Sequence, residues 1–357
     1  MTERVLDGPK VTRDRIVFSF PDQDRTLAAV RLYQEVSRPR SGPEMTYDAG
    51  EGVWKVEFPR PDAARMEYLI EIAHPDGSTE MVTDPTNPLR AAGPFGDKSV
   101  VEMDGYSAPD WLEHPRAGTS RNIEVRCRPA GRRLPAIIWD PEGLEPDEPA
   151  PLLIVHDGPE YAGLSSLTRF LQWCIDSGAL PAHRAALLPP VERDQMYSAS
   201  ASYARSLTHE IVPDILAAAP ISPGRNMRIG MGASLGALAM LHAHRKNPAT
   251  FGGLFLQSGS YFRMRFDKQE SGFVRFRRIS RFVGEVLTTQ EWAHPIPVMM
   301  TCGSIEENLA NNRAVAHALR KQGYDVTFYK NPDGHNWIGW RDTFEPHLRE
   351  HLARLWT

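Results

Sequence analysis

Residues 226–245 read NMRIGMGASLGALAMLHAHR and connect a short predicted strand, residues 226–229, to a helix that begins at Leu235. The turn between them is Gly232-Ala233-Ser234-Leu235-Gly236. Small residues are needed here, because bulk at position 232 or 236 would collide with the neighbouring strand or helix. We expect the Ser234 side chain to be exposed at the carboxyl end of the strand. The Leu235 N–H would lie at the start of the helix, where it can stabilise an oxyanion.

A G-x-S-x-G sequence at a strand-to-helix turn is typical of the nucleophile elbow of α/β-hydrolases, which predicts Ser234 as a nucleophile. Dinucleotide binding is the competing interpretation, because Gly230-Met231-Gly232 also opens a glycine-rich turn. That fingerprint places its third glycine three positions after the second, whereas Gly236 follows Gly232 by four. The turn also lies far beyond the first strand–helix–strand unit of the chain. The spacing therefore favours the nucleophile elbow.

From about residue 121 onward, predicted strands alternate with helices, and residues 184–188 form a further apolar stretch. Such alternation predicts a mostly parallel sheet with helices on both faces, so we expect an α/β-hydrolase domain over residues 116–357. The strands are predicted at residues 123–128, 136–139, 152–155, 227–229, 253–256, 298–301 and 325–329, and the helices at 164–177, 203–217, 235–245, 308–322 and 344–355.

The first hundred residues predict a different architecture. Short, partly alternating segments rich in Val, Ile, Tyr and Phe are separated by turns, and their spacing of about ten residues predicts a small β-sandwich over residues 1–115. A connector rich in Pro and Gly, residues 84–106, is expected to be packed because it carries Phe95, Val100, Val101 and Met103. The strands are predicted at residues 15–20, 27–36, 52–58, 66–73 and 80–83.

The composition excludes several classes of protein. The 357 residues suffice for two domains, and the formal net charge of −4 argues against an electrostatically driven nucleic-acid binder. Three cysteines, an odd number, imply no disulfide framework. No apolar run approaches the ~18 residues of a membrane span, and the first twenty residues lack the apolar core of a signal peptide. We therefore expect a cytoplasmic protein that does not bind membranes.

A serine nucleophile of this fold needs an acid and a histidine later in the chain. His335 lies in the loop NPDGHNW, residues 331–337, directly after a predicted strand. The acid is expected after the preceding strand, in the loop CGSIEE at residues 302–307. Glu306 is favoured by its spacing from the glycine of this loop, but Glu307 stays an alternative that could instead begin the next helix. Either carboxylate could accept the Nδ1–H of His335.

A second oxyanion donor is expected in the loop HDGPEY, residues 156–161, which follows the apolar strand LLIV. Pro159 has no N–H, so Gly158 or Glu160 must donate, and we favour Gly158 alongside Leu235.

Four histidines fit metal patterns only formally. His347 and His351 match H-x-x-E-H, but few residues follow in which another ligand could lie, and we interpret the segment as a solvated C-terminal helix. His242 and His244 point to different faces of one helix. We predict no metal site.

Residues 261–286 reverse the acidic balance of the chain, with seven basic residues against three acidic ones and five interleaved phenylalanines. One interpretation is a solvated amphipathic helix. The other is a cover over the site, which attracts an anionic aromatic substrate through charge and cation–π contacts. The side chains expected to contact a substrate are Arg193, Tyr261, Phe262, Arg275, Arg278 and Trp337.

Longer motifs resemble the enterochelin (enterobactin) esterase family, and the resemblance covers nearly the whole chain. In the first part it rests on DPTNP at 84–88, GPFG at 93–96 and PDWL at 109–112. In the second part it rests on HDG at 156–158, GASLG at 232–236, FGG at 251–253, QSGS at 257–260, GHNW at 334–337 and WR at 340–341.

The resemblance implies a cytoplasmic serine esterase that hydrolyses ferric siderophore trilactones and needs no cofactor. The family's serine falls on Ser234, its histidine on His335, and Glu306 matches its acidic position. This chain has Ala237 where the family has a further glycine, and Tyr261-Phe262 where the family has a tryptophan-rich pair. The alternatives are an esterase for feruloyl, acetyl or other acyl esters, and a non-catalytic ligand-binding protein on the same scaffold. The oligomeric state stays open, a homo-oligomer included.

Overall fold

The strands of the first hundred residues have side chains that alternate between buried and more exposed positions. In a computed structural model, which describes residues 8–356, this alternation runs along β2 (Arg15–Pro21) and β7 (Arg65–Ala73). A period of two is expected of strands that pack one face against a core and turn the other toward water.

Two antiparallel sheets share that core. Phe18 and Trp54 of one sheet pack in a single buried cluster with Leu32 and Ile70 of the other, so the predicted β-sandwich is confirmed. The first sheet has the order β1 (Lys10–Val11), β2, β6 (Val53–Pro59), β5 (Thr46–Asp48). The second has the order β4 (Ser41–Glu44), β3 (Ala29–Gln34), β7, β10 (Lys98–Glu102), β9 (Arg90–Ala91), with β8 (Thr79–Val82) paired to β7.

The connector contributes strands of its own, because β9 and β10 both lie within residues 84–106. Val100, Val101 and Met103 are buried, as expected. Phe95 is not, since its side chain is fully exposed, and for this residue the expectation of packing was wrong. Phe95 lies in the short Gly93–Gly96 turn, which holds it away from the core.

The second part of the chain builds the predicted mostly parallel sheet. Strands β14, β13, β15, β16 and β17 pair in parallel, while β11, β12 and β14 pair antiparallel at one side. The order is β11 (Thr119–Cys127), β12 (Arg132–Asp140), β14 (Arg184–Leu188), β13 (Leu152–His156), β15 (Arg228–Ala233), β16 (Gly253–Gln257), β17 (Val298–Gly303), β18 (Val326–Asn331).

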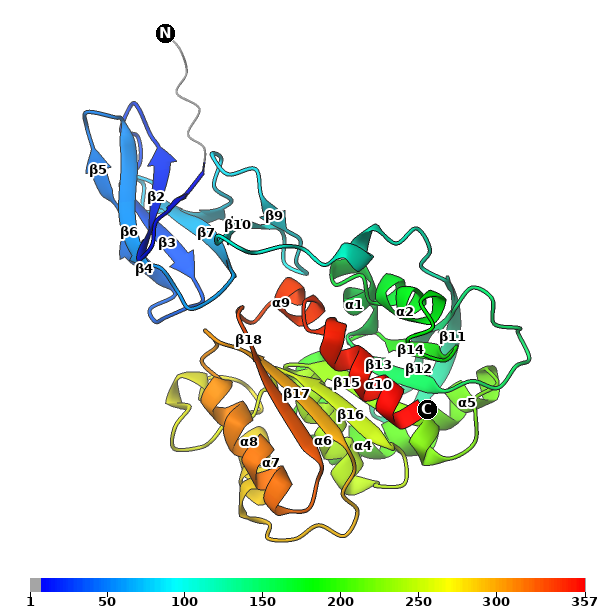
Figure 1. The fold of residues 1–357 in the computed structure, drawn as a ribbon. Coiled ribbons are helices and arrows are strands. Elements are labelled where there is room, and N and C mark those ends of the chain that lie inside the picture. Colours follow the sequence, from blue (N-terminus) through cyan, green and yellow to red (C-terminus); the bar gives the residue numbers. More distant parts are fainter. Residues whose placement is uncertain (1–7, 357) are drawn as a thin grey trace. The chain divides into compact units, whose positions relative to one another are not determined.

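Helices cover both faces of this sheet (Figure 1). On β16, Leu254 faces the cluster that includes α6, and its neighbour Phe255 lies against His351 of the last helix. The helices are α1 (Gly158–Leu164), α2 (Leu167–Asp176), α3 (Arg193–Met196), α4 (Ala201–Ser206), α5 (Val212–Ala218), α6 (Leu235–Lys246), α7 (Phe276–Thr288), α8 (Leu309–Lys321), α9 (Trp337–Arg341) and α10 (Arg349–Trp356). Short 3₁₀ or π turns are η1 (Asp110–Glu113), η2 (Arg128–Ala130), η3 (Leu207–Ile211), η4 (Arg225–Met227), η5 (Lys268–Glu270) and η6 (Phe344–Leu348).

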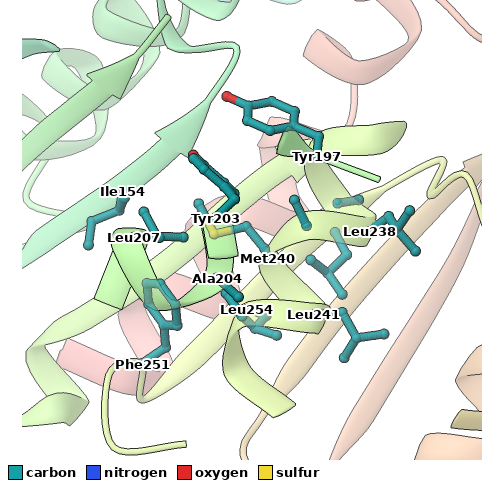
Figure 2. Close-up of a cluster of buried hydrophobic side chains, with 14 of the residues drawn as sticks. Ile154, Tyr197, Tyr203, Ala204, Leu207, Leu238, Met240, Leu241, Phe251 and Leu254 are labelled. Carbon is teal, nitrogen blue, oxygen red and sulfur yellow. The ribbon is translucent and has the colours of Figure 1, made fainter. Parts of the chain in front are cut away.

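Helix α6, which follows Ser234, is buried along ten successive residues, from Leu235 to His244. Figure 2 shows Leu238, Met240 and Leu241 of this helix packed beside Leu254 of β16 and Tyr203 of α4. A helix that is buried on all sides is held by packing rather than by one apolar stripe. The helix therefore anchors the turn that carries Ser234.

Helix α10 corrects one expectation. Instead of a solvated C-terminal helix, it buries His351, Leu352 and Trp356. The side chain of His351 extends from α10 toward the ring of Phe255, because the helix covers one face of the sheet.

The described chain divides into two units, each made of several segments. The first consists of residues 8–107 together with 303–307 and 332–339, and the second of residues 108–302, 308–331 and 340–356. The loops that carry Glu306 and His335 thus belong to the first unit, whereas Ser234 belongs to the second.

Candidate active site

The turn at Ser234 has the strained backbone of a nucleophile elbow. Ser234 has φ 57° and ψ −122°, a conformation that costs a residue with a side chain about 1–3 kcal/mol. Its N–H donates to Gln257 O (2.9 Å) and its carbonyl accepts from the Ser260 N–H (3.1 Å), so the segment after β16 holds the turn. A Cβ on Gly232 would lie 2.6 Å from the carbonyl carbon of Gly236, which explains the glycine. The Ser234 side chain is partly exposed.

A second serine lies within hydrogen-bond distance of the serine that is predicted as nucleophile. Ser260 Oγ lies 3.0 Å from Ser234 Oγ, and Ser260 is only 5% exposed. Ser260 was not predicted as a site residue. The sequence feature that contains Ser260 is the QSGS motif, which was used only as part of the family resemblance.

The two predicted oxyanion donors each begin a helix. Leu235 is the first residue of α6, and Gly158 is the first residue of α1. The loop that carries Gly158 packs directly on the elbow, since His156 Nδ1 lies 3.1 Å from Gly236 O. A Cβ on Gly158 would lie 2.4 Å from the Cα of Leu187, so only glycine fits there. The oxyanion role of both N–H groups stays a prediction.

His156 is a structural residue in this loop. Because a carbonyl only accepts, Nδ1 donates to Gly236 O, and Nε2 accepts from the hydroxyl of Tyr203 at 2.8 Å. Complete burial lowers the pKa of His156 to about 4, which keeps the ring neutral at pH 7.

The structure brings Glu306, and not Glu307, to the predicted histidine. Glu306 Oε2 lies 2.8 Å from His335 Nδ1, and the other oxygen accepts from the Gly303 N–H at 2.7 Å. The Glu306 side chain is 1% exposed, whereas that of His335 is 35% exposed. Since Nδ1 donates to the carboxylate, Nε2 is the nitrogen that can accept a proton.

Glu307 has other partners. Its carboxylate lies 3.0 Å from Arg38 Nε and 3.4 Å from Arg40 Nη2 on the sandwich. The two neighbouring glutamates therefore have separate surroundings.

The arginines predicted to contact a substrate make contacts within the protein. Arg193 pairs with Asp157 through two hydrogen bonds, of 2.9 and 2.8 Å. Arg275 Nε donates to Gln195 Oε1 at 2.7 Å, and Arg278 Nε donates to Ser198 O at 2.5 Å. Arg275 and Arg278 thus both bind the segment 195–198, whereas Arg193 binds the loop after β13.

The aromatic candidates differ in exposure. Tyr261 is fully buried, and Phe262 is partly buried against Phe273 and Phe276. Trp337, the first residue of α9, is partly exposed. Contact of these residues with a substrate stays a prediction.

The two histidines of α6, His242 and His244, are buried in the core. His242 packs against Phe282 and His244 against Tyr324, and burial lowers the pKa of each to about 4. Within residues 8–356, no three His, Cys, Asp or Glu side chains gather in a way that could hold a metal ion. Over the same stretch, no helix combines the length and the apolar character that crossing a membrane requires.

Known proteins share both the sequence pattern and the fold. The sequence profile of the family described as "Putative esterase" matches residues 128–351. The iron(III) enterobactin esterase of Dickeya dadantii (strain 3937) is 27% identical over 237 residues, 60% of this chain and 53% of that protein, so the chain spans about half of its length. The iron(III) enterobactin esterase of Escherichia coli O6:H1 (strain CFT073) is 24% identical over 292 residues, 78% of this chain and 68% of that protein.

A solved structure extends the likeness to both units. The ferric enterobactin esterase from Salmonella typhimurium has a TM-score of 0.77 at 20% identity, covering 98% of this chain and 96% of that chain. The predicted fold, a β-sandwich followed by an α/β-hydrolase domain, is confirmed. The resemblance to enterochelin esterases is confirmed, and the matching family is one of esterases, in line with the predicted class. Since the profile covers more than half of the sequence, the chain belongs to this esterase family.

Proposed function

We propose that this protein hydrolyses carboxylic esters through an acyl-serine intermediate, with Ser234 as nucleophile, His335 as base and Glu306 as the acid that orients it. The observation that carries the proposal is the strained turn at Ser234, because a positive φ at a serine persists only where the surrounding structure enforces it. The hydrogen bond between His335 and the buried Glu306 supports the other two roles.

The sheet supports the combination of these residues. Ser234, Glu306 and His335 follow the carboxyl ends of β15, β17 and β18, which lie in one sheet with β16 between β15 and β17. The N–H of Val298, at the start of β17, donates to Asp325 O just before β18, so these two strands begin at the same edge. Active-site residues of such sheets lie at the carboxyl ends of the strands.

The proposed reaction follows from the hydrogen-bonding capacity of each group. Ser234 Oγ attacks the ester carbonyl carbon, and its proton passes to Nε2 of His335. The N–H groups of Leu235 and Gly158 stabilise the oxyanion. The ester C–O bond then breaks, and the leaving alkoxide takes the proton from Nε2. Water hydrolyses the acyl-serine in the same way, with His335 again as base and Ser234 regenerated.

For the substrate, we propose a siderophore trilactone in its ferric form, hydrolysed in the cytoplasm so that iron is released. The names of the two curated relatives, both iron(III) enterobactin esterases, support this choice. The segment before and within α7 supports it independently, because Arg265, Arg277 and Arg281 are exposed there together with Met264 and Phe266. Arginine can meet an anionic catecholate both as a cation and by stacking on its ring.

A fluorophosphonate probe tests the mechanism. We expect labelling of the protein at Ser234, located by mass spectrometry of the digested adduct, and no labelling of Ser234→Ala. An unlabelled wild-type protein would favour the alternative of a non-catalytic binding protein. A panel of iron-free and ferric cyclic trilactones, feruloyl esters and acetyl esters then tests the substrate, and the highest kcat/KM is expected for the ferric trilactone.

A further inference from the structure

The loop that carries His335 is tied to the β-sandwich by a buried ion pair. Arg65 Nη1, at the start of β7, lies 3.3 Å from Asp333 Oδ2, two residues before His335. The side chains of Arg65 and Asp333 are 4% and 6% exposed. The guanidinium of Arg65 also lies over the ring of Tyr106, 5.5 Å from its centroid. The arginine is therefore held on the side of the sandwich as well as by the loop.

The carboxylate of Asp333 organises the loop on both sides of the histidine. Its Oδ1 accepts from the N–H of Gly334 at 2.7 Å and from Nδ2 of Asn336 at 2.8 Å. These two residues flank His335 directly. A movement of the Asp333 side chain would consequently shift the backbone that carries the imidazole.

Backbone contacts reinforce the same connection. The N–H of Ala64 donates to Pro332 O at 2.6 Å, and the N–H of Met103 donates in turn to Ala64 O at 2.9 Å. The loop that carries Glu306 packs closely against the loop of His335, because a Cβ on Gly303 would lie only 2.2 Å from Asp333 O. Ser304 Oγ donates to the carbonyl of Asp62 on the sandwich side. Both halves of the Glu306–His335 pair thus rest on one stretch of the sandwich.

Arg65 lies closer to the carboxylate of Asp333 than to that of Glu67. Glu67 Oε1 lies at 3.9 Å from Arg65, and Lys98 lies 3.7 Å from Glu67 and 3.1 Å from Glu35. Burial raises the pKa of Glu67 to about 7, although Lys98 and Arg65 oppose the rise, so Glu67 carries only part of a charge near neutral pH. Loss of Arg65 would remove a cationic group that pairs with the buried Asp333 carboxylate, and we expect the Asp333 side chain to shift in response.

We propose that Arg65 is a positioning residue for ester hydrolysis, acting through Asp333 on His335. This inference rests on the proposed role of His335 as base. It implies that an arginine 268 residues away in the sequence from Asp333 controls turnover without touching the substrate. Because reacting groups misplaced by about 1 Å can lose ~100-fold in rate, even a small loop displacement is measurable.

The test compares Arg65→Met, Arg65→Lys and Asp333→Asn with Arg31→Met as the control, on one activated aryl ester. Arg31 lies on β3 of the same sheet. It pairs with Glu44 and Glu71, and neither residue belongs to the loop of His335. We expect Arg65→Met to lower kcat by roughly 10–100-fold with KM changed less than about threefold. Arg65→Lys, which keeps the charge, should recover most of kcat, and Arg31→Met should stay within about twofold of the wild type.

A double-mutant cycle tests the route through Asp333. The variant Arg65→Met/Asp333→Asn replaces both members of the ion pair, so we expect its kcat to be no lower than that of Arg65→Met. Wild-type kcat in folded Arg65→Met, an equal loss in Arg31→Met, or additive losses in the double variant would overturn the inference. If Arg65→Met does not fold, wild-type kcat in Asp333→Asn overturns it instead. Loss of activity in Ser234→Ala and His335→Ala alongside a fully active Arg65→Met refutes only this inference, whereas full activity of those two variants refutes the proposed function.

Discussion

Ser234 Oγ and Ser260 Oγ lie 3.0 Å apart, and the N–H of Ser260 also donates to the carbonyl of Ser234. A hydroxyl carries a single proton, so one serine donates to the other. In the proposed mechanism, Ser234 gives its proton to a base, and Ser260 would then donate to the developing negative charge on Oγ. A hydrogen bond to an ionised oxygen is stronger than one between neutral groups, which makes this contact favourable in the reactive state.

Ser260→Ala is therefore expected to lower kcat by about tenfold, less than the loss of a direct oxyanion donor. The rate of reaction with a fluorophosphonate should fall in parallel, since it depends on the same attack by Ser234. Ser280→Ala is a matched control, because Ser280 is also 5% exposed and its Oγ has no hydrogen-bond partner among the described residues. An equal change in the two variants would show that the hydroxyl of Ser260 has no role in the reaction.

Ser234→Ala and His335→Ala are each expected to lower kcat by roughly 10⁴–10⁶, and the double variant by little more. In the proposed mechanism the nucleophile and the base act together. Once one of them is replaced, replacing the other causes little further loss of kcat. Steady-state kinetics of the three variants on one ester measures this. Losses that multiply would contradict the assignment.

The two glutamates of the loop after β17 should respond differently. Glu306→Gln is expected to lower kcat by roughly 10²–10⁴, because the amide cannot stabilise the imidazolium of His335. Glu307→Gln should stay within about threefold, since its partners Arg38 and Arg40 form partly exposed ion pairs that contribute little. The reverse order of kcat would move the role of the acid to Glu307.

Acid is expected to destabilise the fold through buried histidines, of which His183 is the clearest. The ring is fully buried between Trp139 and Trp356, its Nδ1 donates to Pro181 O, and burial lowers the pKa of His183 to about 4. Between pH 6.5 and 4 this histidine binds a proton in the unfolded chain but not in the folded chain. The free energy of unfolding therefore falls as the pH falls through this range.

The size of this effect can be measured by urea unfolding at pH 7 and pH 5. His183→Phe removes the titrating ring, and the variant should lose about 2 kcal/mol less stability than the wild type between the two pH values. Equal losses in both proteins would show that His183 is not responsible.

Salt should weaken the capture of an anionic substrate. We expect kcat/KM for a ferric tris-catecholate ester to fall severalfold from low to physiological ionic strength, while kcat/KM for a neutral aryl ester stays constant. Arg265→Gln/Arg277→Gln, which changes exposed side chains, should reproduce much of that fall. In contrast, Arg275→Gln and Arg278→Gln should affect both substrates, because these arginines hold residues 195–198. A fall for the neutral ester in the Arg265/Arg277 variant would contradict the electrostatic role.

Much of the fold could be predicted because its signals are local. The strands of the sandwich alternate with a period of two, and the apolar strand LLIV is buried at every position because helices cover both faces of its sheet. The missed strands β1, β4, β5 and β9 have two to four residues, too few for a period to be visible. The missed strand β10 is buried at three successive positions, so it does not alternate. The solvation of α10 was mispredicted for a similar reason, since its charged residues hide the buried face formed by His351, Leu352 and Trp356.

By itself, the sequence determined the turn at Ser234, because the requirement for glycine at 232 comes from the backbone of Gly236, four residues further along the chain. The glycine at 236, in contrast, is required by His156 and Asp157, which are distant in the chain. The sequence also limited the acid to two neighbouring glutamates. Only the tertiary structure decided that Glu306 meets His335, that Ser260 lies beside Ser234, and that Arg65 pairs with Asp333. These contacts join segments distant in the chain, and which side chains meet there depends on how strands and loops pack, which no local pattern specifies.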